Sequence, residues 1–352
     1  MSLNPQNVTI DDVANEANVS RATAGRVIGG YGSVSEKSKQ KVLEAIEKLN
    51  YRPNTIAQSL RSHRTKTIAV VLGNIKNHYC NSVVYAVEKE ANKSGYNVLI
   101  CNTNENELNE VRQMQSILSR QVDGVILMST YHDDEEIPQI YKDIYINTVP
   151  MVLADREIKG LDIDVIMSNN EESSYNATKY LISLGHRKIG VIGSYCYSTV
   201  RDRINGYTRA LIDAGIEVDE SLVMKANYAE IGAGENLFYE LMSRHKDVTA
   251  LYVLNDTLNS SVLVALKKKG LRIPEDISVL AWDDVDVNEL MGITTIIQPI
   301  EEIGKKAVGR LFEMMKHPEK LRGGERMILG TEMVVRQSCA SPKHLNGDIN
   351  NN

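Results

Sequence analysis

Residues 8–28, VTIDDVANEANVSRATAGRVI, determine how the amino-terminal part of this 352-residue chain folds. Thr9 and Ser20 are good helix N-caps, and each precedes a segment with apolar residues at helical spacing. The residues that end at Ser20 are expected to form the turn between the two helices. Val13 and Ala14 then face inward. The stretch predicts two short helices around a tight turn, the pattern of a helix-turn-helix unit.

Two further helices are predicted in the sequence that follows. Residues 35–49 form a third helix, and residues 54–62 form a short fourth one that starts separately after Pro53. A three-helix unit followed by a short helix can place one helix in the major groove of DNA and another in the minor groove. We therefore predict DNA binding; the alternative is a helical trio that binds no nucleic acid.

The beginning of the second helix supplies the expected DNA contacts. Helical spacing turns Ala24 toward the core and leaves the two arginines outward. An arginine can donate two parallel hydrogen bonds to guanine, so Arg21 and Arg26 are the expected base readers. The hydroxyl groups of this region suit phosphate oxygens. The DNA-contacting residues predicted here are Thr9, Ser20, Arg21, Ala22, Thr23 and Arg26.

The charge of the chain is distributed unevenly. Residues 1–66 carry ten Lys and Arg against six Asp and Glu, a net +4, whereas the rest carries 30 against 40, a net −10. DNA contact is therefore expected only in the amino-terminal part, and it should weaken with salt because binding displaces phosphate counterions. The positive charge is modest, so two such units in a homodimer should be needed for tight binding.

Several classes of protein are disfavoured by the sequence. No stretch approaches the roughly eighteen uninterrupted apolar residues of a membrane span, and a secretory signal pattern is missing. The four cysteines are scattered, which predicts neither a disulfide framework nor a zinc site. We find no phosphate-binding glycine loop, Gly-x-Ser-x-Gly elbow or His-Glu-x-x-His motif. The expectation is a soluble cytoplasmic protein that is not an enzyme and has no cofactor or metal.

From residue 66 onward, short apolar runs alternate with helical patterns. Strands rich in Val, Ile and Leu, buried on both faces and joined by helices, form open parallel sheets. Two such sheets are expected. The predicted strands are 67–72, 97–101, 124–128 and 150–153, then 188–192, 223–226, 250–254 and 278–281. The predicted helices are 83–93, 107–120, 171–184, 201–214, 231–243 and 257–268.

Polar residues follow most of these strands. Ligands of open parallel sheets bind outside the carboxyl ends of the strands, and two facing sheets form a cleft there. Carboxylates accept hydrogen bonds from hydroxyl pairs, Arg and Asn fix neighbouring oxygens, and an aromatic ring covers an apolar ring face. The set suits a small polyol, most often a sugar. The strand-end segments are 77–79, 155–156, 195–203, 227–228, 255–256, 283–284 and residue 298.

The amino-terminal sequence resembles the headpiece of the lactose-repressor (LacI/GalR) family of transcriptional regulators. The segments that carry the resemblance are 8–14, 19–23, 34–36, 51–54 and 57–61. It implies that Asn54, Ala57 and Leu60 contact DNA, with Leu60 as a wedge in the minor groove; the alternative is that Leu60 packs on the core. Residues 54–62 are too few for a stable isolated helix, so they should order only with DNA or a partner chain.

One position in the second helix departs from the family pattern. Ala24-Gly25 stands where the family usually has a β-branched residue followed by Ser. A glycine inside a helix costs about 1 kcal/mol of helix stability and removes a possible backbone contact. Weaker binding or an unusual operator is therefore expected.

The resemblance continues over almost the whole chain and extends to the family's effector domain, which is similar to periplasmic sugar-binding proteins. Cys80 departs from the usual aromatic there, which makes purine stacking less favourable. The structural alternatives are an Arg203–Asp283 ion pair and a helix-capping role for Asn255. The effector-binding residues that the resemblance implies are Tyr79, Asp155, Arg203, Tyr228, Asn255, Asp283 and Gln298.

These observations predict a fold class and a division of the chain. An all-α helix-turn-helix headpiece and hinge helix should precede an α/β core of two open parallel-sheet subdomains, like a periplasmic binding protein. The chain should cross between subdomains near 162–168, 292–298 and 323–330, which permits closure on a ligand. The expected parts are the headpiece 1–53, the hinge 54–65, the core 66–340 and a disordered tail 341–352. The expected N-subdomain comprises about 66–163 and 297–323, and the C-subdomain about 164–296 and 324–340.

The predicted function is regulation of transcription by a homodimer on a near-palindromic operator. Closure on an effector would change the spacing of the two hinge helices, so the sugar should act as an inducer that releases DNA. One alternative is a regulator that uses a phosphoprotein or another corepressor. A second alternative is a ligand-binding protein that does not act on DNA.

Overall fold

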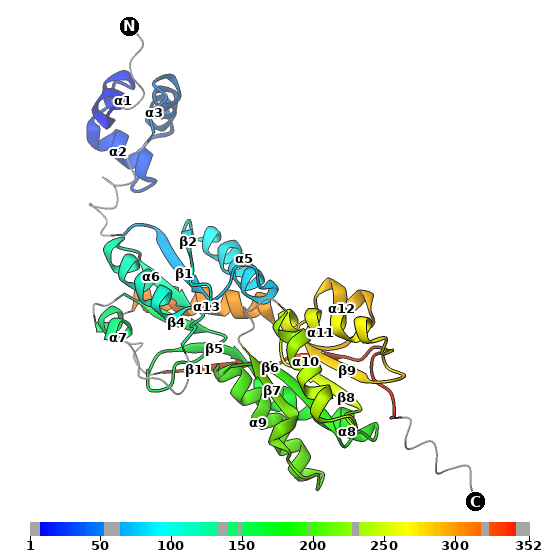
Figure 1. Cartoon of the computed structure of the whole chain (residues 1–352). Coiled ribbons are helices and arrows are strands. Elements are labelled where there is room, and N and C mark those ends of the chain that lie inside the picture. The colour runs from blue at the N-terminus through cyan, green and yellow to red at the C-terminus, as the bar shows by residue number, and fades with distance from the viewer. Residues whose placement is uncertain are drawn as a thin grey trace, which may run out of the picture. The chain divides into compact units, whose positions relative to one another are not determined.

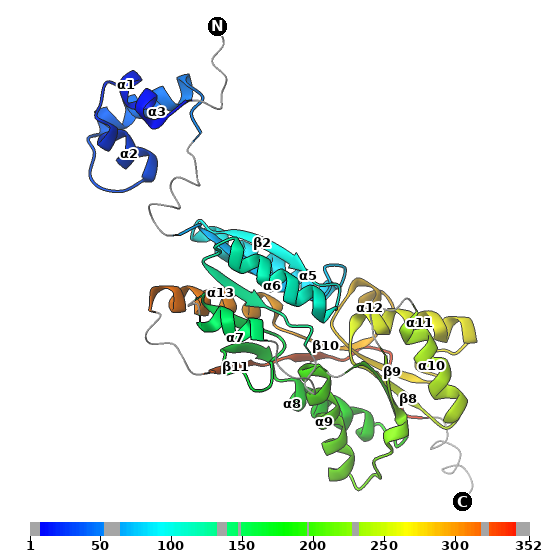
Figure 2. The same ribbon diagram turned by 60° about the vertical axis from the view of Figure 1, so that its left-hand side comes forward.

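A computed structural model of the chain describes residues 8–52, 64–131, 139–146, 149–195, 197–226, 232–317 and 324–342. The chain divides into two compact units, one up to Thr65 and the other from Lys66 onward, which are described separately below. Figures 1 and 2 show the three helices of the first unit and the larger α/β unit. No described helix has the length and apolar character that a bilayer span requires.

The first unit contains α1 (Ile10–Glu16), α2 (Arg21–Gly29) and α3 (Glu36–Lys48). The predicted caps are confirmed: Thr9 accepts from the Asp12 amide and Ser20 from the Thr23 amide. Small apolar side chains allow the short helices to pack closely. The core of this unit consists of Val13, Ala14, Ala17, Ala24, Val42 and Ala45.

Two six-stranded sheets form the second unit. Their strand orders are β11-β5-β4-β3-β1-β2 and β12-β10-β9-β8-β6-β7, and within them only β12 pairs antiparallel, with β10. The predicted two-sheet architecture is confirmed. The strands of the first sheet are β1 (Thr67–Leu72), β2 (Asn97–Asn102), β3 (Gly124–Leu127), β4 (Met151–Ala154), β5 (Val165–Ser168) and β11 (Arg326–Leu329). Those of the second are β6 (Ile189–Ser194), β7 (Val223–Ala226), β8 (Ala250–Val253), β9 (Ser278–Trp282), β10 (Thr294–Ile297) and β12 (Glu332–Val334).

Helices cover both faces of each sheet because alternate strand residues point to opposite sides. In β1, Ile68 and Val70 pack in one apolar cluster with α5 and α13, while Ala69 and Val71 pack in another with α6 and α7. The helices of the first half are α5 (His78–Lys93), α6 (Glu107–Ser119), α7 (Gln139–Ile146) and α13 (Ile300–Lys316). Those of the second are α8 (Asn170–Ser183), α9 (Ser198–Asp213), the short 3-10 helix η2 (Glu220–Leu222), α10 (Ala233–Arg244), α11 (Asp256–Lys269) and α12 (Asp286–Leu290).

The boundaries of the two halves differ from the predicted ones. Residues 165–168 and 326–329 were expected in the C-subdomain, but β5 pairs with β4 and with β11 in the first sheet. Residues 297–323 were expected in the N-subdomain. Ile297, however, is the last residue of β10, which belongs to the second sheet. The division at 163/164 and 323/324 is therefore wrong by about one strand, because sequence patterns do not reveal which distant strands pair.

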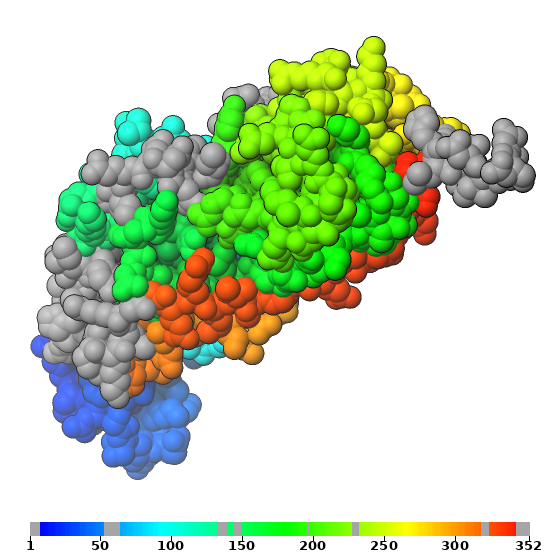
Figure 3. Space-filling view, turned by 90° about the horizontal axis from the view of Figure 1, so that it is seen from below, coloured from blue at the N-terminus to red at the C-terminus, as the bar shows by residue number. Residues whose placement is uncertain are grey.

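The chain crosses between the halves at three places: after β5, after β10 and between β11 and β12. These crossing segments bond to one another. Ser168 donates to Gln298 Oε1 at 2.8 Å, and the Thr331 amide donates to Asn169 Oδ1 at 3.0 Å. Figure 3 shows the carboxy-terminal residues, coloured orange-red, running along one face from the first half to the second. The crossings thus form one linked region about which the halves can move.

Candidate functional site

The second helix of the first unit presents the predicted DNA-contacting side chains to solvent. Arg21, Ala22 and Arg26 are exposed, whereas Ala24 is fully buried. Arg21 is held loosely, since its Nε lies 3.4 Å from Asp11 Oδ1 and both side chains are more than half exposed. Such an exposed pair contributes little to stability, so Arg21 can leave Asp11 for a DNA base at small cost.

The predicted phosphate-contacting hydroxyls have a second role in the helix ends. Thr9 forms a capping box with Asp12, and the hydrogen bond from Thr9 lowers the pKa of that carboxyl. Ser20 Oγ accepts from the Thr23 amide at 3.1 Å and lies 2.8 Å from Thr23 Oγ1. Substitution of these residues would therefore affect helix stability as well as any DNA contact.

Gly25 lies inside α2, where a side chain would fit. A Cβ at this position would meet Ile10 at 3.7 Å and Tyr31 at 3.8 Å, which is ordinary van der Waals contact. We expect Gly25→Ala to stabilise the headpiece by about 0.8–1 kcal/mol, because it restricts the unfolded backbone. Hydrogen exchange of the α2 amides in the full-length protein measures this change, with the exposed Ala22 as the site of a control Ala22→Gly substitution. Slower exchange in Ala22→Gly or faster exchange in Gly25→Ala would contradict the argument.

Four predicted contact residues lie outside the described part of the chain. Asn54, Ala57 and Leu60 belong to residues 53–63, and Tyr228 belongs to residues 227–231. Their roles remain predictions.

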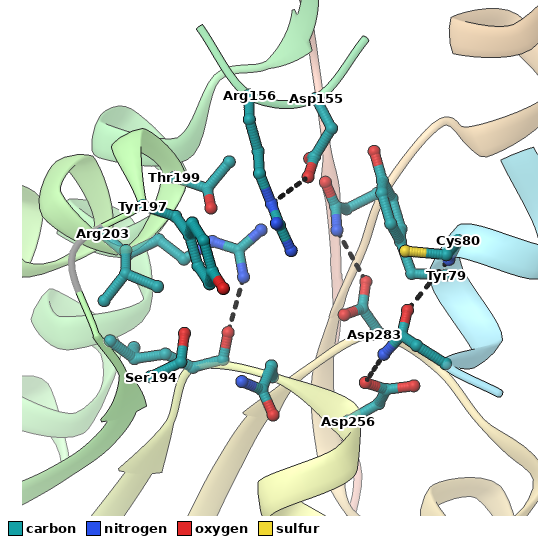
Figure 4. A pocket seen from close by; sticks show the side chains of 15 residues that line it. Tyr79, Cys80, Asp155, Arg156, Ser194, Tyr197, Thr199, Arg203, Asp256 and Asp283 are labelled. Carbon is teal, nitrogen blue, oxygen red and sulfur yellow. Dashed lines mark hydrogen bonds and ion pairs between the residues drawn. The ribbon is translucent and has the colours of Figure 1, made fainter. Parts of the chain in front are cut away.

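A cavity lies where the carboxyl ends of the two sheets meet. Residues that follow β1 and β4 of the first sheet and β6, β8, β9 and β10 of the second line it (Figure 4). Its volume is about 40 Å³, which holds a few water molecules but is far below the size of ordinary ligand pockets. A ligand as large as a monosaccharide therefore requires the halves or the lining side chains to move apart. The lining residues are Asn77, Tyr79, Cys80, Asp155, Arg156, Ser194, Tyr197, Thr199, Val200, Arg203, Leu254, Asn255, Asp256, Asp283 and Gln298.

Six of the seven predicted effector-site residues lie in this cavity, all except the undescribed Tyr228. Arg203 comes from α9 and is fixed by hydrogen bonds to Leu254 O at 2.5 Å and Asn170 Oδ1 at 2.8 Å. Its guanidinium lies 3.6 Å from the centre of the Trp282 ring. Within the described residues no ion pair joins Arg203 to Asp283, so the simple pairing considered above is not observed.

Asn255 and Asp283 are held by their local structure. Asn255 caps α11, since its Oδ1 accepts from the Leu258 amide at 2.8 Å. The capping alternative is therefore confirmed, although Asn255 also lines the cavity. Asp283 Oδ1 accepts from Gln298 Nε2 at 2.7 Å. Burial raises the pKa of Asp283 to about 7, and the negative charge of Asp256 adds to the shift.

Asp155 and Tyr79 carry unpartnered polar atoms in the cavity. Within the described residues, Asp155 Oδ1 and the Tyr79 hydroxyl have no hydrogen-bond partner, although both atoms are buried. Burial raises the pKa of Asp155, against the opposing charges of Arg156 and Arg203. A buried polar atom without a partner is costly, so these two atoms mark a place that a ligand or water completes.

One group of three residues joins the two halves beside the cavity. The predicted strand-end segments 155–156 and 195–203 contain two of these residues, and the third, Glu105, was not predicted. We call Glu105, Arg156 and Tyr197 the interdomain triad. Arg156 Nη1 lies 3.1 Å from Glu105 Oε2, the Tyr197 hydroxyl donates to Glu105 Oε2 at 2.7 Å, and the Arg156 guanidinium lies 3.8 Å from the Tyr197 ring centre. Glu105 and Arg156 follow strands of the first sheet, whereas Tyr197 precedes α9 of the second half. For Glu105, its position shortly after β2 was the available signal in the sequence.

Two further contacts hold the halves together beside the triad. Asn77 Nδ2 donates to Asp256 Oδ1 at 2.8 Å, and Arg201 Nη2 lies 2.8 Å from Glu157 Oε1. Each joins a residue of the first half to one of the second. These contacts join the two halves directly on either side of the cavity.

A small helix-turn-helix unit joined to a two-half α/β core with a central cavity defines a class of ligand-responsive DNA-binding regulators. Comparison with known proteins supports this class. Residues 9–54 match the model of bacterial regulatory proteins of the lacI family, and residues 65–329 match that of periplasmic binding proteins and the sugar-binding domain of the LacI family. The chain belongs to the LacI family of DNA-binding transcriptional regulators, and the predicted resemblance is confirmed.

Individual relatives match along nearly their whole length. The chain is 30% identical over 338 residues to the transcriptional repressor PurR of Pasteurella multocida, covering 95% of this chain and 99% of the relative. It is 31% identical over 341 residues to the ribose operon repressor of Haemophilus influenzae, with the same coverage of 95% and 99%. The solved complex of the transcriptional regulator CelR with cellobiose is 28% identical, with a TM-score of 0.70 and coverage of 94% of this chain and 99% of that one.

Proposed function

We propose that this protein is a homodimeric repressor of carbohydrate-utilisation genes that a small sugar-like effector releases from a near-palindromic operator. The observation that carries the proposal is the cavity between the two sheets, with unpartnered polar atoms on Asp155 and Tyr79. Relatives named for ribose and bound to cellobiose support a carbohydrate. Thr9, Ser20, Arg21, Ala22, Thr23, Arg26, Asn54, Ala57 and Leu60 would contact the operator.

The coupling between effector and operator would run through the relative position of the two halves. An effector that fills the cavity must displace or rearrange the contacts that now close it, including the interdomain triad. The three crossings allow this as a hinge motion. In a twofold dimer the movement changes the spacing of the two hinge segments, and thereby their fit to one operator. Coupling of this kind is reciprocal, so operator and effector reduce each other's affinity equally.

Titration of operator binding with candidate sugars tests the proposal. Fluorescence anisotropy with a labelled DNA fragment from beside the gene for this protein measures affinity with and without each sugar. We expect at least one sugar to weaken DNA binding. Strengthened binding would instead assign the sugar as a corepressor, and an unchanged affinity with every sugar would favour a phosphoprotein or another partner. Failure to bind any chromosomal fragment would favour a ligand-binding protein that does not act on DNA.

The raised pKa of Asp283 predicts a pH dependence of effector binding. A sugar hydroxyl that donates to Asp283 binds the ionised carboxylate, which is the minor form below the pKa of about 7. For an effector that does not itself titrate, affinity should therefore rise by up to tenfold per pH unit as the pH approaches about 7 from below, and level off above it. Calorimetric titration at several pH values measures this, and Asp283→Asn should flatten the profile. A flat profile for the unsubstituted protein would show that Asp283 accepts no such bond.

A further inference from the structure

The charges that line the cavity do not balance. Three carboxylates, those of Asp155, Asp256 and Asp283, face two guanidinium groups, those of Arg156 and Arg203. Arg156 is already paired with Glu105, whose side chain is fully buried. Arg156 Nε also lies 3.7 Å from Asp155 Oδ2, so one guanidinium is shared between two carboxylates. With Glu105 counted, four carboxylates stand against two guanidinium groups. Because a buried charge is stable only when it is paired, a closed cavity with this surplus favours an occupant that brings positive charge.

The hydrogen bonds of the cavity indicate where a positively charged group of an occupant would bind. Asp256 Oδ1 accepts from Asn77 at 2.8 Å, and Asp283 Oδ1 accepts from Gln298 at 2.7 Å. Asp155 Oδ2 lies 3.7 Å from Arg156 Nε, but Asp155 Oδ1 and the Tyr79 hydroxyl have no hydrogen-bond partner within the described residues, although each of these residues is only 6% exposed. Figure 4 shows Asp155, Tyr79 and Asp283 on one side of the cavity and Arg203 and Tyr197 on the other. The unpaired atoms thus lie on the carboxylate-rich side.

We infer that the effector carries a protonated amino group, as in an amino sugar or a related aminopolyol, which binds between Asp155 and Tyr79. An ammonium group has three donors and no acceptor, which suits a carboxylate oxygen and a phenol oxygen at once. Its hydrogen bond to a carboxylate is charge-assisted, about twice as strong as the bond that a neutral hydroxyl would make. The remaining hydroxyls would face Asp283, Asn255 and Arg203. The inference rests on the proposed function and narrows its effector class.

A set of matched sugars tests the inference on the full-length protein. The probes are glucosamine, galactosamine and mannosamine, their three parent hexoses and their three N-acetyl derivatives, at neutral pH, where the amines are largely protonated. We expect the best amino sugar to bind at least about tenfold tighter than both its parent and its N-acetyl form. Equal or tighter binding of the neutral partners overturns the inference, and so does the failure of all nine to bind.

Substitution of Asp155 provides a second test of the same inference. Asp155 has a left-handed backbone with φ of 69°, a conformation that Asn also adopts readily, so Asp155→Asn removes the charge without a backbone change. We expect the amino sugar to lose at least about tenfold in affinity, and clearly more than the parent hexose loses, because only the amine gives up a charge-assisted bond. The exposed Asp247 supplies the control Asp247→Asn, which should alter neither. Equal losses for both sugars in Asp155→Asn would overturn the inference.

Operator release distinguishes this inference from the proposed function. If a neutral hexose releases the operator as well as its amino form does, the proposed sugar effector stands. The inference that the effector carries an amino group then fails. If no carbohydrate of any charge changes operator binding, the sugar-effector part of the proposed function fails too.

Discussion

Replacing Arg21 and Arg26 together with Ala is expected to lower operator affinity by about 1000-fold or more. A base-reading arginine contributes about 1–3 kcal/mol to binding, and a dimer would lose two such contacts in each half-site. Both side chains are exposed on α2, and neither is part of the headpiece core, so the unit should remain folded. Anisotropy with a labelled operator at fixed salt measures the loss.

The matched control is Lys41→Ala on α3. Lys41 is exposed and carries the same charge, but it lies on a different helix from the predicted base readers. Its loss removes one positive charge from the headpiece, which should weaken binding to all sequences alike and only modestly, because attraction to the DNA backbone does not depend on sequence. If the double substitution weakened binding to operator and to random DNA by the same factor, Arg21 and Arg26 would be phosphate contacts and the assignment as base readers would be wrong.

Replacing Arg203 with Ala is expected to destabilise the core by about 3 kcal/mol or more. The substitution leaves Leu254 O and Asn170 Oδ1 without their donor and removes the cation beside Trp282. Each unsatisfied buried group costs about 1–3 kcal/mol. Effector affinity should fall as well, by at least about tenfold. Trp282 is the single tryptophan of the chain, so its fluorescence during urea unfolding reports directly on this region.

Two variants separate the local role of Arg203 from a general effect of charge. Arg203→Lys keeps the charge but loses the planar donor set and the stacking, so it should recover only part of the stability and little of the effector affinity. Arg209 lies on the same helix, half exposed, and pairs with Glu171 and Glu172. Arg209→Ala should therefore cost no more than about 1 kcal/mol. A comparable loss in Arg203→Ala and Arg209→Ala would contradict the buried role of Arg203.

The predictions from sequence succeeded where the cause is local. Ser20 caps α2 through an amide three residues away, and β1 begins and ends as its apolar run predicts. They failed where the cause is distant. Val165 pairs with Arg326, and the two strands lie about 160 residues apart in the sequence, so no local pattern assigns β5 and β11 to the first sheet.

The candidate site divides in the same way. Asp155 and Asp283 come directly after strands, and Arg203 lies in the helix that follows β6. The family resemblance marks all three positions, and all three residues line the cavity. Glu105 does not line the cavity, and it contacts Arg156 and Tyr197, which do and which lie 51 and 92 residues away in the sequence. Helix α13 was also not predicted, although Ile303, Ala307 and Leu311 recur at helical spacing and are buried against the first sheet.

The closed cavity has a kinetic consequence. Because Glu105 and Tyr197 bridge the halves and the space between the sheets is about 40 Å³, an effector of the size of a monosaccharide can enter only after the halves or the lining side chains move apart. Its apparent affinity is then the intrinsic affinity reduced by the fraction of molecules that stand open. At high effector concentration the observed association rate reaches a ceiling equal to the rate of opening. The time in which the protein responds to an effector is thus limited by the rate at which its own core opens, whatever the effector concentration.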